Sequence, residues 1–119
     1  MRRHKFGAVA TTVDGRRFAS KKEAKRYSDL RALERGGYIV GLELQPEFEM
    51  RAENGKKVGV YRADFAYWQK AGSEHVLPRS QPLAGLTYII EDVKGFKTPM
   101  YRLKKRHVEA QYGITIHEV

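Results

Sequence analysis

The chain contains no cysteine, which excludes a disulfide framework, a thiolate zinc site and a thiol nucleophile. Any bound metal must therefore be held by oxygen or imidazole ligands, which favours a hard cation such as magnesium. No apolar run approaches the roughly 18 residues that a membrane helix needs, so we expect no membrane partner. A length of 119 residues allows one modest core, and we expect a single domain over residues 1–119.

Acidic residues are scarce relative to basic ones, with 14 Asp and Glu against 23 Lys and Arg, which gives a formal net charge of +9. A domain this small with such an excess has an extended positive surface, which indicates a polyanionic partner. A solvated basic surface and an anionic lipid surface are the alternatives. Since no basic helix has a clean apolar face with exposed aromatic anchors, the charge favours nucleic acid.

Local signals predict one α/β domain, a small mixed sheet with helices against it. Ser20 and Glu23 form a capping-box pattern that begins a helix ending at Gly36–Gly37. The alternating segment 42–50 predicts an edge strand interrupted at Pro46, and Asn54-Gly55 predicts a type I′ turn that returns residues 58–68 antiparallel to it.

The remaining elements follow a long connection at residues 69–85. Residues 86–95 predict a third strand that is covered on both faces, since Ile89 and Ile90 are adjacent. Thr98 with Pro99 predicts the start of a second helix that Gly113 ends, before a short last strand. The predicted order is therefore α, β, β, β, α, β, preceded by a flexible basic arm at residues 1–12.

Three residues in the predicted strands combine into a candidate catalytic site. Asp64 falls in the middle of a strand, where an acid is poorly suited unless it binds something. Asp92 and Lys94 are two apart, so strand periodicity places them on one face. Two carboxylates suffice for magnesium, and a lysine beside them can orient a water and offset charge that develops on phosphorus. Glu23 joins them if the first helix packs on that face.

The segments FASKKEA, YRADF and IIEDVKG, taken in this order, resemble the PD-(D/E)XK nuclease superfamily over most of the chain. The likeness is greatest to a small phage-carried branch catalogued as a domain of unknown function. It implies a restriction-endonuclease-like sandwich in which Glu23 supports the metal site, Asp64 and Asp92 bind Mg²⁺, with Mn²⁺ as a substitute, and Lys94 serves catalysis. Glu91 precedes Asp92, and a β-bulge at this strand end would turn Glu91 to the metal instead.

The resemblance implies a magnesium-dependent DNA endonuclease whose products have a 5′-phosphate and a 3′-hydroxyl. So small a chain favours recognition of DNA shape, so we expect processing of branched or duplex DNA, such as Holliday junctions in phage recombination, by a homodimer. The N-terminus has no apolar stretch after its charges, so a cytoplasmic location is expected, in the bacterial host if a phage encodes the chain. The residues expected to contact DNA are Arg2, Arg3, Lys5, Arg102, Lys104, Lys105 and Arg106.

Each of these motifs also has a simpler explanation. The cap alone accounts for Glu23, and either an ion pair with Arg62 or burial with bonds to the backbone accounts for Asp64. Lys94 is then an ordinary charge at a strand end, and the basic run of the second helix is usually a solvated face. Two other functional classes remain open, a non-catalytic DNA-binding protein that keeps the nuclease fold and an RNA-directed enzyme.

Overall fold

The computed structural model describes residues 10–70 and 85–119, which form a mixed α/β fold with two helices and three small sheets. The N-terminal arm is therefore described only in part, and Arg2, Arg3 and Lys5 lie outside the described residues. Within the described ranges, no helix has the length and apolar character needed to cross a membrane.

The central sheet has four strands in the order β3-β6-β7-β8. The strands are β3 (Ile39–Leu44), β6 (Phe65–Lys70), β7 (Leu86–Asp92) and β8 (Ile116–Glu118). The β3–β6 and β6–β7 pairs are antiparallel, whereas β7 and β8 are parallel. The sheet is therefore mixed, as predicted, and β3 lies at its edge.

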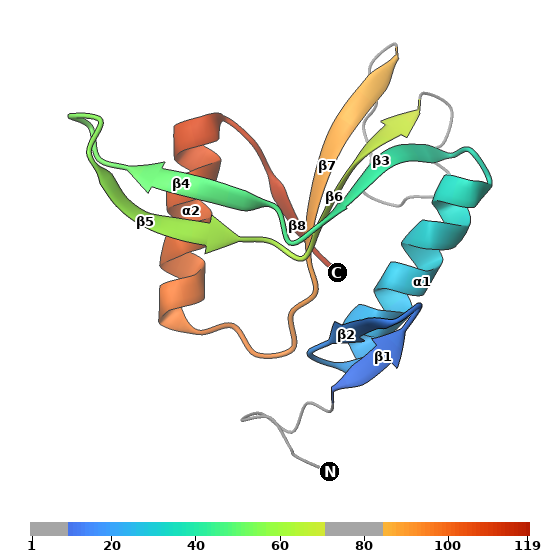
Figure 1. Cartoon of the computed structure of the whole chain (residues 1–119). Helices are drawn as coiled ribbons and strands as arrows, with labels where there is room; N and C mark the ends of the chain where they lie inside the picture. The colour runs from blue at the N-terminus through green and yellow to red at the C-terminus, as the bar shows by residue number, and fades with distance from the viewer. Residues whose placement is uncertain (1–9, 71–84) are drawn as a thin grey trace.

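Helices cover both faces of the central sheet (Figure 1). Helix α1 (Lys21–Arg35) packs Tyr27 and Leu30 against Ile89 and its neighbours on one face. On the other face, Val108 of α2 (Pro99–Tyr112) packs with Ile90. Adjacent residues of β7 thus enter opposite core clusters, which confirms that this strand is covered on both sides.

The helix boundaries are as predicted because local caps define them. Ser20 Oγ accepts the Glu23 N–H (3.1 Å) at the start of α1. Thr98 Oγ1 accepts the Tyr101 N–H (3.0 Å) at the start of α2, and Gly113 ends this helix in the left-handed region at φ 65°. These signals lie within a few residues of the ends that they set.

The predicted order of elements is wrong in that it misses four strands. Strands β1 (Thr11–Val13) and β2 (Arg16–Phe18) form a hairpin before α1, so the predicted flexible arm does not extend to residue 12. Asp14 and Gly15 both have positive φ, 53° and 74°, as a type I′ turn requires. At Asn54-Gly55 only Gly55 has positive φ, so the hairpin predicted there forms but its turn is not type I′.

The two long segments predicted as single strands each bend at one shared corner. The first divides into β3 and β4 (Glu47–Arg51), the second into β5 (Lys57–Arg62) and β6, and β4 with β5 forms a separate two-stranded sheet. The Gln45 N–H donates to Asp64 O (2.9 Å), and the Ala63 N–H donates to Pro46 O (3.1 Å). The corner therefore places Asp64 at a bend, where the sequence predicted the middle of a strand.

Candidate functional site

Asp64 lies at the shared corner, and two hydrogen bonds to main-chain groups at the end of β7 hold it there. Its Oδ2 accepts the Val93 N–H (2.7 Å), and its own N–H donates to Glu91 O (3.1 Å). These bonds join the corner between β5 and β6 to the last residues of the neighbouring strand. The carboxylate of Asp64 is therefore fixed next to the Asp92 side chain.

Asp92 is fully buried at the end of β7. Its Oδ2 accepts a hydrogen bond from the Tyr61 hydroxyl of β5. The other oxygen, Oδ1, lies 3.3 Å from Lys94 Nζ, yet within the described part of the chain no donor makes a well-aligned hydrogen bond to it. A buried carboxylate oxygen with only an ion-pair contact has capacity for a further ligand.

Asp64 and Asp92 interact strongly because the corner brings them together. Burial, then the neighbouring Asp92 and Glu23 carboxylates, raise the pKa of Asp64 to about 8, although the Val93 N–H acts in the opposite direction. Two carboxylates in one buried place resist double ionisation unless a cation neutralises them. The pair is therefore suited to a divalent cation.

Glu23 approaches the same pair from the first turn of α1. Its main-chain N–H closes the helix cap on Ser20, while its carboxylate is near Asp92 and Lys94. Burial is the main cause that raises the pKa of Glu23, with Lys94 lowering it and Asp92 raising it. The cap alone therefore does not account for the buried position of this acid.

Lys94 follows the end of β7 and is held between a carboxylate and an aromatic ring. Its Nζ lies 3.3 Å from Asp92 Oδ1 and 4.6 Å from the centroid of the Tyr101 ring. The Tyr101 hydroxyl donates to Glu118 Oε2 (2.8 Å), which fixes the ring. This cation–π contact and the ion pair restrict the ammonium to the candidate site.

Glu91 projects to the other face of β7. Arg26 of α1 donates to it through Nε (2.7 Å) and Nη2 (2.5 Å), and the Tyr67 hydroxyl also donates to Oε2. This carboxylate is only 3% exposed and already has a bidentate cationic partner. Of the two alternative acids at this strand end, the geometry favours Asp92 as a metal ligand, and Glu91 stabilises the packing of α1.

A metal site built on these residues rests on the two aspartates. Within residues 10–70 and 85–119, no three Asp, Glu or His side chains are grouped to hold one ion. Magnesium commonly takes one or two protein carboxylates and completes its octahedron with water and substrate phosphate. Asp64 and Oδ1 of Asp92, which lies 3.3 Å from Lys94 Nζ and has no hydrogen-bond partner among the described residues, fit this pattern, and Glu23 fits an outer position that would accept hydrogen bonds from bound water.

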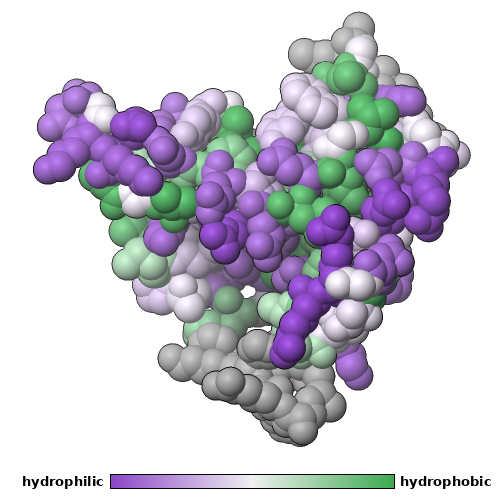
Figure 2. Space-filling view, in the orientation of Figure 1, coloured by the Kyte–Doolittle hydropathy of each residue, from purple (hydrophilic) through white to green (hydrophobic). Residues whose placement is uncertain are grey.

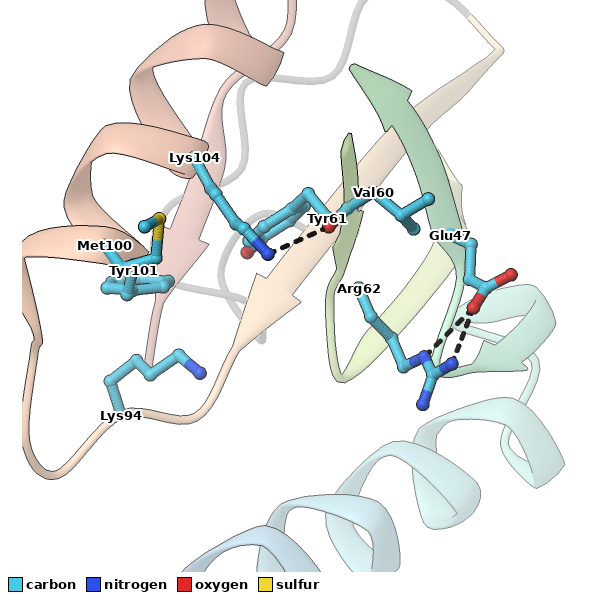
Figure 3. A pocket seen from close by; sticks show the side chains of 8 residues that line it. All are labelled: Glu47, Val60, Tyr61, Arg62, Lys94, Met100, Tyr101 and Lys104. Carbon is cyan, nitrogen blue, oxygen red and sulfur yellow. Dashed lines mark hydrogen bonds and ion pairs between the residues drawn. The ribbon is translucent and has the colours of Figure 1, made fainter. Parts of the chain in front are cut away.

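A groove of about 500 Å³ lies next to Lys94, between β5 and α2 (Figure 3). Lys94 points into this space from the segment after β7, and Lys104 reaches across from α2 to donate to Val60 O (3.2 Å). The surface around the corner is mostly hydrophilic (Figure 2). The residues that line the groove are Glu47, Val60, Tyr61, Arg62, Lys94, Met100, Tyr101 and Lys104.

The predicted DNA-contacting residues of α2 have different surroundings. Lys104 lines the groove, Lys105 lies 3.6 Å from Glu118 Oε2, and Arg102 and Arg106 are exposed. Arg62, the alternative partner considered for Asp64, instead pairs with Glu47 (2.6 Å).

Two tyrosines of the site were not predicted from the sequence. Tyr61 and Tyr101 occur in segments where tyrosine is commonly a packing residue, so their hydroxyl and ring contacts had no distinguishing pattern. Tyr61 and Asp92 are 31 positions apart in the sequence, and only the fold brings the tyrosine hydroxyl to the carboxylate. These side chains orient the acid and the lysine that the motif predicted.

Replacing Tyr61 by phenylalanine is expected to destabilise the protein by about 1.5–3 kcal/mol, because buried Asp92 loses its hydroxyl donor. Urea unfolding in metal-free buffer measures the change. Tyr112→Phe is the matched control, since its hydroxyl bonds to an exposed main-chain oxygen of Glu49, and its effect should be smaller. Equal losses in the two variants would contradict a special contact between Tyr61 and Asp92.

Comparison with known families gives one match, a family model described as a protein of unknown function (DUF1064), over residues 3–79. The match includes Glu23 and Asp64 and ends before β7. No curated protein and no solved structure matches the chain.

Proposed function

The chain belongs to the DUF1064 family of unknown function, and from this premise we propose that it is a magnesium-dependent DNA endonuclease of the PD-(D/E)XK type. The observation that most supports the proposal is the meeting of Asp64 and Asp92 beside Lys94 at the end of β7. The order of the motifs, helix Glu, strand Asp, then Asp-x-Lys, adds to it. So does the net charge of +9, which suits a polyanionic substrate.

In the proposed mechanism, Asp64 and Asp92 would hold the cation with their carboxylates. A bound divalent cation polarises the scissile phosphate and stabilises the charge of the leaving oxygen. Tyr61 keeps one oxygen of Asp92 occupied, so the other remains directed at the site. The hydrogen bond from Val93 similarly orients Asp64.

Lys94 has the role of positioning the water that attacks phosphorus. Its ammonium is held by the Asp92 carboxylate and the Tyr101 ring, so it does not swing freely into solvent. A fixed positive charge at this place also offsets the negative charge that increases on the phosphate during attack. Glu23 accepts a hydrogen bond from water at the other side of the pair.

The substrate in this proposal is branched or duplex DNA, cut by a homodimer. The groove beside the site offers few side chains for reading a long sequence, so recognition of DNA shape fits this surface. Symmetric cleavage of a four-way junction needs two active sites, which a homodimer supplies.

The test is cleavage of labelled linear duplex, single-stranded, flapped and four-way-junction DNA, with matched RNA strands, by the wild-type protein. With Mg²⁺ or Mn²⁺ we expect cleavage of DNA and a preference for the branched forms. Removal of the cation with EDTA should abolish cutting, since the scissile phosphate then lacks the divalent charge that polarises it. Tight DNA binding without cutting of any substrate would instead identify a non-catalytic DNA-binding protein, and cutting of RNA alone an RNA-directed enzyme.

A further inference from the structure

The groove between β5 and α2 has a specific feature that the motif does not include, the side chain of Lys104. This lysine is partly buried and reaches across the groove from α2 to the Val60 carbonyl (3.2 Å). Lys94 enters the same groove from the candidate catalytic site (Figure 3). The groove therefore leads from that site along the surface of α2.

The positive charges in the groove are not equally available to a ligand. Arg62 is neutralised by Glu47 at 2.6 Å, and Lys94 by Asp92 at 3.3 Å. Lys104 donates to a neutral carbonyl, and among the described residues no carboxylate lies within ion-pair distance of it. Its charge is therefore uncompensated in a groove of about 500 Å³.

The neighbouring residue Lys105 is a natural comparison. It lies 3.6 Å from Glu118 Oε2, and Glu118 also pairs with Lys97 (3.0 Å). Lys105 thus has the same charge on the same helix turn but already faces a carboxylate and lies outside the groove lining. The sequence predicted DNA contacts for both lysines, but an anion in the groove meets Lys104 and not Lys105, so the inference keeps Lys104 alone as a phosphate contact.

We propose that the groove binds one strand of DNA and that Lys104 contacts a phosphate flanking the one that is cut. The inference deepens the proposed nuclease function and rests on it. The groove is lined by β5 on one side and α2 on the other, so it admits the backbone of one strand between them. The Val60 carbonyl that Lys104 now contacts is neutral, so the ammonium gains a bond in which both partners are charged when it turns to a phosphate oxygen.

The test compares Lys104→Gln with Lys105→Gln, which have the same net charge. Glutamine at position 104 removes the charge and keeps a polar side chain that is one atom shorter than lysine. Binding to a labelled single strand and to a duplex of the same sequence is measured in EDTA, where no cutting occurs, over a series of salt concentrations. Lys104→Arg, which keeps the charge, tests for rescue.

Lys104→Gln is expected to weaken binding about tenfold, the value of one lost charge-assisted bond, and to reduce the salt slope by about 0.7 on the single strand and 0.9 on the duplex. Lys105→Gln should change affinity less than about threefold, a small part of one phosphate contact, and Lys104→Arg should bind as wild type does. Equal effects of the two glutamine variants, or an effect confined to the duplex, would overturn the inference.

Failure of the groove inference and failure of the nuclease proposal give different results. Wild-type cleavage with equal binding by the two glutamine variants would remove the groove inference and leave the endonuclease in place. Selective loss of binding in Lys104→Gln without any wild-type cleavage would keep the groove as a DNA site and remove the nuclease proposal.

Discussion

Asp64→Asn is expected to lower the rate of DNA cleavage by at least about 10³-fold. Removing one fixed electrostatic group from an active site commonly lowers the rate by up to about this factor. Asparagine keeps an oxygen that can accept the Val93 N–H, so the corner between β5 and β6 should remain intact. What it lacks is the negative charge that holds a cation beside Asp92. The measurement is single-turnover cleavage at saturating protein with Mg²⁺.

The same variant should retain DNA binding and gain stability in metal-free buffer. Because the folded protein raises the pKa of Asp64 from its ordinary 3.8 to about 8, the folded state binds more protons than the unfolded state between these values. The free energy of unfolding of the wild type therefore falls as pH rises through this range. Asparagine does not titrate, so the variant should not show this decrease. Thermal unfolding in EDTA at pH 5 and pH 8.5 should show a higher Tm for the variant, mainly at pH 8.5. A lower Tm at pH 8.5 would contradict the proposed repulsion between the aspartates.

Arg26→Met is expected to destabilise the protein by about 3 kcal/mol, because it leaves the buried Glu91 carboxylate without its cation. This value is at the lower end for broken buried pairs, since the Arg26 side chain is 22% exposed and the Tyr67 hydroxyl still donates. Urea unfolding measures the loss. Arg31→Met is the control on the same helix, where the pair with Glu34 is more exposed and little change is expected.

Cleavage separates the two possible roles of Glu91. If this residue stabilises packing, Glu91→Gln molecules that remain folded at low temperature should cut DNA at nearly the wild-type rate. Loss of cleavage in the folded Glu91→Gln variant would mean that Glu91 belongs to the metal site and that the choice of Asp92 is wrong.

Both helices were predictable because the signals that define them are local. Ser20 sits three residues before Glu23, and Thr98 with Pro99 stands at the first turn of α2. A helix cap is a contact between residues close in sequence, so the residue types and their spacing are enough to predict it. The hairpin β1–β2 has a comparable signal in Asp14-Gly15, which its position in a basic terminal segment obscured.

The corner that creates the candidate site could not be predicted in the same way. Gln45 adopts a left-handed conformation (φ 53°), and its N–H donates to Asp64 O on the other strand. The apolar alternation keeps the same phase on both sides of Pro46, so the sequence indicates an interrupted strand there and does not show that the chain turns into a second sheet. Tertiary contacts decide where those strands bend.

The choice between Glu91 and Asp92 was equally a tertiary matter. Adjacent residues of a strand point to opposite faces, so the motif alone leaves open which one faces Asp64. The structure favours Asp92 because Arg26, 65 positions from Glu91, pairs with Glu91 on one face, whereas Tyr61 contacts Asp92 on the other.

The most direct test of the central claim is Mg²⁺-dependent cleavage of DNA by the wild type and by Asp64→Asn, measured side by side at equal DNA occupancy. The proposed site predicts cutting by the wild type with Mg²⁺, no cutting in EDTA, and a loss of at least about 10³-fold in the variant. Cutting by Asp64→Asn at the wild-type rate would contradict the proposal that Asp64 and Asp92 form the catalytic metal site.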